Sequence, residues 1–148
     1  MECLSCKSLS GEKRVSPGPI IYEGKYWVVE HAYPVKLLGW LVIVLKRHLE
    51  AVHNLTGEEL VELGEIIKKI TGLLHWKFNT EKEYVVCLAV APGFNHIHFH
   101  IVPRTKDFPK ELRGNKAFSL LSEEGKGSIE KEKIIELCEE LKAKLSNR

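Results

Sequence analysis

Apolar residues recur along the chain with two periods, and each period predicts a different kind of element. Short apolar runs bounded by turn residues are typical of β-strands. They predict two strands around Glu23-Gly24 within residues 19–34, a third over residues 40–45 and a fourth over residues 83–91. The run WLVIVL at 40–45 is apolar on both faces, which favours a central strand.

Helical spacing appears in two other segments. Thr56 and Glu59 form a capping-box pattern, which predicts a helix that begins there and continues to about residue 75. Its apolar stripe is Leu60, Leu63, Ile67, Ile70 and Leu74. A second helix is predicted at about 129–145, with the stripe Ile134, Leu137, Cys138, Leu141 and Leu145. This helix is expected to pack on the domain with a solvated side, the alternative being a dimer contact.

The fifth strand is the segment NHIHFHIVPR, residues 95–104. Strand alternation places His96, His98 and His100 on one face, and the apolar residues between them on the other. Five strands and two helices with hairpin-like neighbours predict an α+β fold with a mainly antiparallel sheet. Pro103 is expected to close this last strand.

Length and composition limit the possibilities. A chain of 148 residues, with 44% hydrophobic and 28% charged residues, is expected to form one globular domain over 1–148. Residues 1–19 are expected to form an irregular arm, and residues 105–148 a C-terminal extension. A net charge of +2 argues against nucleic acid or an anionic membrane as a bulk partner. The longest apolar run is too short to span a bilayer, and the opening residues do not resemble a signal peptide, so a cytoplasmic protein is expected.

Four cysteines in a cytoplasmic protein are expected to be reduced, metal-bound or buried. Cys87 and Cys138 fall in a predicted strand and a predicted helix stripe, as small buried hydrophobes do. Cys3 and Cys6 have the spacing of half a zinc site, whose other ligands would have to be histidines. A redox pair is the alternative, but that motif belongs to a βαβ context that is not predicted here.

The three aligned histidines permit two chemistries. All three could bind a metal ion and leave a position open for water. Alternatively, the central imidazole is a nucleophile for phosphoryl groups, and its neighbours orient it and hold the substrate. A solvated strand face with no role is the third interpretation.

The histidine segment resembles the H-φ-H-φ-H-φ-φ signature of the histidine triad (HIT) family of nucleotide hydrolases and transferases, where φ is apolar. The segments LVIVLKRH (41–48) and NLTGEEL (54–60), the VPR that follows the triad and the N-terminal C-x-x-C extend the resemblance. It implies a five-stranded antiparallel sheet with two helices, to which the C-terminal amphipathic helix is added. It also implies a homodimer joined edge to edge. The implied substrate is a purine nucleotide with a second nucleotide, an amine or a sugar phosphate on its α-phosphate.

The resemblance also implies a role for each histidine. His98 would be the nucleophile, His100 would contact the α-phosphate or the leaving group, and His96 would orient the site. Members commonly have Gly-Gln before the triad, where this chain has PGFN and Asn95 becomes a candidate substrate contact. At the acidic position that holds the ribose in many members, this chain aligns His31, and Glu30 is the candidate to replace it.

Zinc-binding members pair the two cysteines with two histidines. Here the implied ligands are Cys3, Cys6, His48 and His96, which would hold a structural zinc, and no organic cofactor is expected. The alternative is that Cys3 and Cys6 lie on a mobile arm and that His48 only forms a hydrogen bond near the triad, as the corresponding histidine does in metal-free relatives. Two other functions stay open: a nucleotide-binding module with negligible turnover, and a metallohydrolase with the three triad histidines as ligands.

Overall fold

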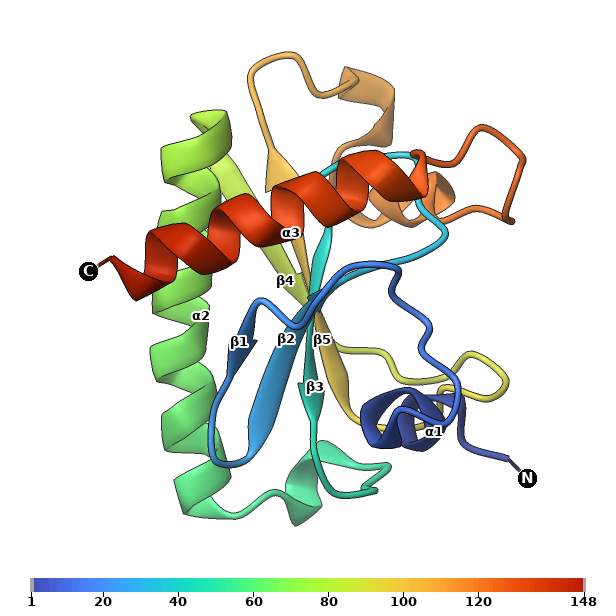
Figure 1. Cartoon of the computed structure of the whole chain (residues 1–148), viewed down its shortest axis with the longest axis vertical. Helices are drawn as coiled ribbons and strands as arrows, with labels where there is room; N and C mark the ends of the chain where they lie inside the picture. Colours follow the sequence, from blue (N-terminus) through green and yellow to red (C-terminus); the bar gives the residue numbers. More distant parts are fainter. Residues whose placement is uncertain (1, 148) are drawn as a thin grey trace.

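The computed structural model describes residues 2–147 and has the predicted α+β architecture, with a five-stranded antiparallel sheet (Figure 1). The strands are β1 (Tyr22–Glu23), β2 (Trp27–His31), β3 (Leu41–Leu45), β4 (Lys82–Val86) and β5 (His98–Arg104). Their order across the sheet is β1-β2-β3-β5-β4. The histidine strand β5 therefore lies between β3 and the edge strand β4.

Both predicted helices are present, and three short 3₁₀ helices accompany them. The α-helices are α2 (Gly57–Phe78) and α3 (Lys131–Ser146), and the 3₁₀ helices are η1 (Val52–Asn54), η2 (Lys110–Leu112) and η3 (Gly114–Leu120). The capping box of α2 is confirmed, because Thr56 and Glu59 exchange side-chain and backbone hydrogen bonds. The stripe of α2 was partly wrong, since Leu60 is 46% exposed while Ile66 and Leu73 are buried.

The sequence predicted an irregular N-terminal arm, and this was wrong. The arm contains the helix α1 (Leu4–Ser10). The thiol of Cys3 caps this helix by accepting a hydrogen bond from the Cys6 N–H at 3.3 Å. Gly11, at φ 83°, ends it in the left-handed conformation. A seven-residue helix has little stability of its own, so contacts such as Leu4 N–H to Gly93 O, at 2.8 Å, account for its presence.

Two strand boundaries differ from the prediction. β4 ends at Val86, and the apolar residues Leu88 and Val90 beyond it are 56% and 78% exposed. β5 begins two residues later than the histidine pattern suggested and continues through Pro103 to Arg104. Proline is tolerated there because β3 has already ended opposite Ile101, so β5 has no strand on that side.

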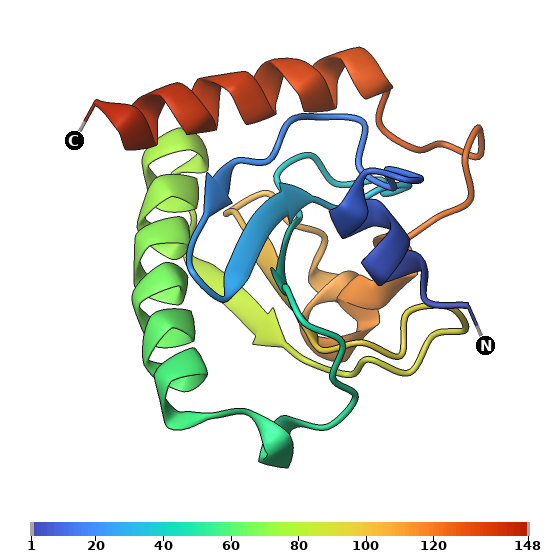
Figure 2. The same ribbon diagram turned by 60° about the horizontal axis from the view of Figure 1, so that its bottom comes forward.

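The two faces of the sheet have different partners. One face packs against α2 and α3, and its core includes Trp27, Ile43, Ile101 and the buried residues of α3: Ile134, Leu137, Cys138 and Leu141. The opposite face is covered by α1 and by the segment that contains η2 and η3 (Figure 2). The packing role predicted for the C-terminal helix is thus confirmed.

The strand register defines which side chains share the second face. Val42 lies opposite His100 on one side and opposite Glu30 on the other, and Val44 lies opposite His98. Because cross-strand partners project from the same face, Glu30, His98 and His100 belong to one surface of the sheet.

Among residues 2–147, no helix is both long and apolar enough to cross a bilayer.

The tryptophans divide into two groups. Trp27 and Trp40 are completely buried, whereas Trp76 is 49% exposed. Trp76 lies near the C-terminal end of α2, where the Lys144 ammonium is 4.9 Å from its ring centroid. A cation over an aromatic face is a favourable arrangement at the surface, so this position does not require burial.

Candidate active site and metal cluster

His98 is oriented by a backbone hydrogen bond. Its Nδ1–H donates to the carbonyl oxygen of His96 at 2.6 Å, which assigns the ring proton to Nδ1. Nε2 then carries the lone pair, and it has no hydrogen-bond partner within residues 2–147. Burial lowers the pKa of His98, against the opposing effect of this hydrogen bond. The result is a neutral imidazole with a free nitrogen.

His100 is held in the opposite sense. The indole Nε1–H of Trp40 donates to Nδ1 of His100 at 3.0 Å, so the proton of the neutral ring is on Nε2. Burial, and to a smaller extent the neighbouring His98, lower the pKa of His100 to about 4. The rings of His98 and His100 have centroids 4.9 Å apart. A free lone pair and a free N–H donor therefore lie side by side.

His96 is separated from the other two. It precedes β5 and is fully buried, with its Nε2–H donating to the carbonyl of Leu45 at 2.7 Å. Its Nδ1 lies 3.5 Å from the sulfur of Cys3 and 3.6 Å from that of Cys6. The structure thus places the first triad histidine with the cysteines rather than in a row on the strand.

Four side chains converge at this point. One ligand atom from each of Cys3, Cys6, His48 and His96 lies within 4.8 Å of the others, so these residues are positioned to bind a metal ion. Within the described part of the chain, no other group of histidine, cysteine and acidic residues converges in this way. Two thiolates and two imidazoles are a donor set typical of structural zinc.

Each histidine of this metal cluster is supported through its second nitrogen. His96 uses the Leu45 carbonyl, and His48 donates its Nε2–H to Glu50 Oε2 at 2.9 Å. The other oxygen of Glu50 accepts a hydrogen bond from the amide of Asn95 at 3.0 Å. Such outer partners fix the tautomer and orientation of ligating histidines, so the cluster is organised beyond its four ligands.

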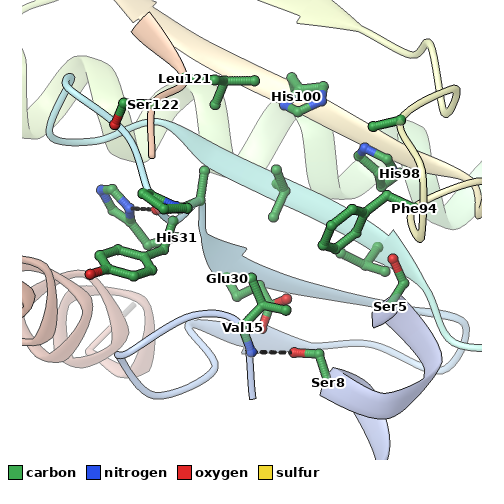
Figure 3. A pocket seen from close by; sticks show the side chains of 16 residues that line it. Ser5, Ser8, Val15, Glu30, His31, Phe94, His98, His100, Leu121 and Ser122 are labelled. Atoms are coloured by element: carbon green, nitrogen blue, oxygen red, sulfur yellow. Dashed lines mark hydrogen bonds between the residues drawn. The ribbon is translucent and has the colours of Figure 1, made fainter. Parts of the chain in front are cut away.

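A cavity of about 370 Å³ adjoins the other two histidines. His98 and Phe94 lie at one end, His31 and Ser122 at the other, and Glu30 lies between them (Figure 3). The remaining lining is Ser5, Ser8, Val15, Ala32, Tyr33, Pro34, Val42, Val44, Ala91, His100 and Leu121. A mainly apolar lining with a few polar groups and a reactive end is typical of small-ligand sites.

The two candidate contacts to a nucleotide sugar, His31 and Glu30, differ in whether they have a free hydrogen-bonding atom. His31 uses both nitrogens within the protein, because Nδ1–H donates to Ala32 O and Nε2 accepts from the Gly39 N–H. Burial lowers the pKa of His31 to about 4. Glu30 lines the cavity, and one of its carboxylate oxygens binds Arg14 at 2.5 Å. Its second oxygen has no partner among the described residues and is the available acceptor.

Asn95 is exposed, binds Glu50 and is not part of the cavity lining. Sequence reasoning missed Trp40, Glu50 and Arg14 as partners of the site. The only sequence signal for Trp40 was its position directly before the central strand, two residues before Val42, where strand alternation places both side chains on the same face. Glu50 and Arg14 carried no recognisable pattern.

Comparisons with known proteins agree with this geometry. Residues 2–117 match the family described as "Scavenger mRNA decapping enzyme C-term binding". An uncharacterized HIT-like protein of Methanocaldococcus jannaschii is 27% identical over 105 residues, which cover 69% of this chain and 78% of that protein. A hypothetical histidine triad nucleotide-binding protein of Sulfolobus tokodaii superposes with a TM-score of 0.72 at 19% identity, covering 98% of this chain and 93% of the other.

Two further solved structures share the fold. A Zn-bound histidine triad family protein of Mycobacterium smegmatis has a TM-score of 0.64 at 18% identity, covering 98% and 96% of the two chains. The diadenosine triphosphate hydrolase of Plasmodium falciparum has a TM-score of 0.67 at 14% identity, covering 87% and 77%. The chain therefore belongs to the family described as "Scavenger mRNA decapping enzyme C-term binding", and its membership of the histidine triad (HIT) proteins confirms what the sequence pattern predicted.

Proposed function

We propose that this protein is a nucleotide hydrolase or transferase in which His98 attacks the α-phosphate of a bound purine nucleotide. The observation that carries the proposal is the 2.6 Å hydrogen bond from His98 Nδ1–H to the His96 carbonyl. This bond leaves Nε2 unprotonated at the end of a cavity large enough for a nucleoside. Two comparisons support the substrate class, since one neighbour is a diadenosine triphosphate hydrolase and another a histidine triad nucleotide-binding protein.

The proposed reaction has two steps. In the first, Nε2 of His98 forms a bond to the α-phosphorus, and the bond to the leaving group breaks with its electron pair. In the imidazolium that results, Nδ1–H still donates its hydrogen bond to the His96 carbonyl, and this bond stabilises the positive charge. In the second, water or another acceptor attacks the phosphorus, the P–N bond breaks and its electron pair returns to Nε2, and the proton lost by the attacking group passes to solvent. His100, through Nε2–H, would donate to a non-bridging phosphate oxygen in both steps.

The metal cluster has a structural role in this proposal. Zinc held by Cys3, Cys6, His48 and His96 would link α1 to the loop before β5 and fix the carbonyl that orients His98. The Zn-bound protein of the same fold supports this assignment. The three triad histidines do not converge as a ligand set, which argues against the metallohydrolase alternative.

Substrate contacts and assembly complete the proposal. The free oxygen of Glu30 is a candidate acceptor for nucleoside hydroxyl groups, while His31 has no free nitrogen for this purpose. Homodimerisation with the two sheets joined edge to edge stays a prediction, and β4 is one of the two edge strands. The exposed side chains of Val85, Leu88 and Val90 at this edge are consistent with it.

The test is intact-protein mass spectrometry within the first turnovers of diadenosine triphosphate. We expect a transient mass increase of one adenylyl group in the native chain and none in His98→Ala. His53→Ala, an exposed histidine outside the cavity, is the matched control and should form the adduct normally.

Two results would contradict the proposal. Nucleotide binding without turnover or adduct, across purine dinucleotides and phosphoramidates, would instead indicate a binding module. Turnover that survives His98→Ala would assign the chemistry to a different nucleophile.

A further inference from the structure

We infer that Trp40 is a positioning residue that holds His100 as a neutral Nε2–H donor. The site therefore favours substrates whose leaving group departs as a phosphate anion over substrates whose leaving group is an amine. This inference rests on the proposed function of His98 and narrows its substrate class.

The contact between Trp40 and His100 has only one possible polarity. An indole nitrogen carries a hydrogen and offers no lone pair, so at 3.0 Å the Nδ1 of His100 must be the acceptor. This contrasts with a carbonyl or carboxylate partner, which would require a proton on the facing nitrogen. The tautomer of His100 is therefore fixed by the chemical identity of its neighbour.

Packing keeps the indole in place. Trp40 is fully buried in a cluster that includes Val35, Val102, Phe108 and Ala117. The ring of Phe118 meets the rings of both Trp40 and His100 edge-on, at centroid distances of 5.4 and 5.1 Å. The backbone is fixed as well, because the Ala32 N–H donates to the Trp40 carbonyl at 2.9 Å. The indole cannot turn away from His100 without opening this cluster.

This arrangement makes His100 a poor general acid, which means that it does not readily transfer its proton to the leaving group. If His100 were an imidazolium, its Nδ1–H would face the indole N–H, and two donors would meet. If the neutral ring gave up its Nε2 proton, it would become an imidazolate anion in a buried site. The low pKa of His100, about 4, agrees with the first point. His100 can therefore share its proton in a hydrogen bond but cannot readily release it.

Other groups in the cavity do not replace this function. His31 has both nitrogens engaged within the protein, and its Nδ1–H is held by the Ala32 carbonyl. Glu30 is bound to Arg14. Burial and the nearby Glu124 carboxylate raise the pKa of the Tyr33 hydroxyl, which makes it a weaker acid. The histidine pair thus faces the leaving group without a ready acid among the titratable residues that line the cavity.

Leaving groups differ in how much they need such an acid. When a P–O bond to a phosphate breaks, the electron pair stays on oxygen, and the product is an anion that is stable at neutral pH. When a P–N bond to an amine breaks, the pair stays on nitrogen, which must gain a proton as it leaves. A positioned acid contributes roughly 10²–10⁴-fold to such steps. A site without one discriminates against amines and accepts phosphate leaving groups.

The experiment measures the ratio of kcat/KM for two substrates that share an adenylyl group. Diadenosine triphosphate loses ADP, and adenosine 5′-phosphoramidate loses ammonia. Trp40→Phe removes the indole N–H and keeps an aromatic ring. Trp27→Phe is the matched control, because Trp27 is equally buried and donates its indole N–H to the Glu59 carbonyl, away from the cavity.

We expect the native chain to prefer the phosphate leaving group. In Trp40→Phe, His100 is free to take a proton on either nitrogen, so the preference should fall by about tenfold or more. In Trp27→Phe it should change by less than about twofold, since the site is untouched. A ratio that is the same in both variants, or a native preference for the phosphoramidate, would overturn the inference.

Failure of the proposed function would look different. Neither substrate would then show turnover that depends on His98, nor a covalent adduct, and the inference would fall with it. If Trp40→Phe does not fold, nitrogen NMR of the native chain labelled at histidine decides. We expect His100 to carry its proton on Nε2 at pH 7, and a proton on Nδ1 would refute the inference.

Discussion

The metal cluster and the proposed catalytic pair, His98 and His100, use the same kind of side chain in opposite ways. His48 and His96 turn Nδ1 toward the cysteines and bind the protein through Nε2. His98 and His100 do the reverse: Nδ1 binds the protein, and Nε2 is free beside the cavity. Which nitrogen of each ring stays available depends on the group that forms a hydrogen bond with the other nitrogen. These groups are the carbonyls of Leu45 and His96, the carboxylate of Glu50 and the indole of Trp40. An outer partner thus selects what each histidine can do.

The largest expected effect is on turnover, and substitutions at His98 and His48 should distinguish the two regions by their effects on turnover and zinc content. His98→Asn should lower kcat/KM by about 10⁴-fold or more, because the nucleophile is lost, while the zinc content stays at one per chain. His48→Asn should have the complementary result, with loss of zinc and a smaller loss of turnover. Elemental analysis and steady-state kinetics on both variants test this pair.

The comparison would break in one of two ways. Zinc loss in His98→Asn would place His98 among the ligands. Full zinc retention in His48→Asn would remove His48 from the cluster and leave the observed proximity without a metal.

A smaller effect is expected from the outer partner of His48. Glu50→Gln replaces a carboxylate acceptor by an amide and should weaken zinc binding by about 10–100-fold. Competition with a chromophoric chelator measures the affinity. Glu140→Gln is the control, because Glu140 is also an ion-paired surface carboxylate, bound to Lys77 at 2.7 Å. Equal affinity in the two variants would show that Glu50 does not support the cluster.

The smallest effect concerns His31, whose two nitrogens are both used internally. Its pKa is about 4 in the folded protein and near 6.5 when unfolded, so between these values the unfolded chain binds more protons. The contribution of the neutral ring is complete above pH 6.5 and is lost as pH falls toward 4. From pH 7 to pH 5 it should decrease by about 2 kcal/mol.

Urea unfolding of the native chain and of His31→Gln, at pH 7 and pH 5, isolates this contribution. The metal cluster titrates in both proteins, so its effect cancels in the difference. An identical pH dependence of the free energy of unfolding in the two proteins would contradict the assignment.

Local sequence patterns predicted what depends on local structure. The period of two in residues 96–102 predicted the histidine strand, and Thr56 with Glu59 predicted the start of α2, because strand pleat and helix capping act within a few residues. The two cysteines were joined to His48 and His96 only through the family resemblance. Their proximity is a tertiary fact, which the structure bears out.

Features that depend on distant pairing were not predicted. Trp40 reaches His100 because β3 and β5 pair in one register, with Val42 opposite His100, and nothing near either residue encodes that register. His96 leaves the strand because its imidazole joins the cysteines, which are 93 and 90 residues away in sequence. The arm was predicted irregular because α1 is stabilised by contacts with the loop before β5, which composition does not reveal.

The cavity has walls of two origins, and this has a consequence for how its selectivity can change. One wall includes His98 and His100 of β5, where His98 pairs with β3 and His100 pairs with both β3 and β4. The facing wall includes Ser5, Ser8 and Val15, which belong to no strand. Exchange of residues in this segment would alter the shape and polarity offered to a ligand without disturbing any strand pair. Substitutions at Ser5, Ser8 and Val15 that keep Cys3 and Cys6 would thus change ligand preference without changing β5 or the metal ligands.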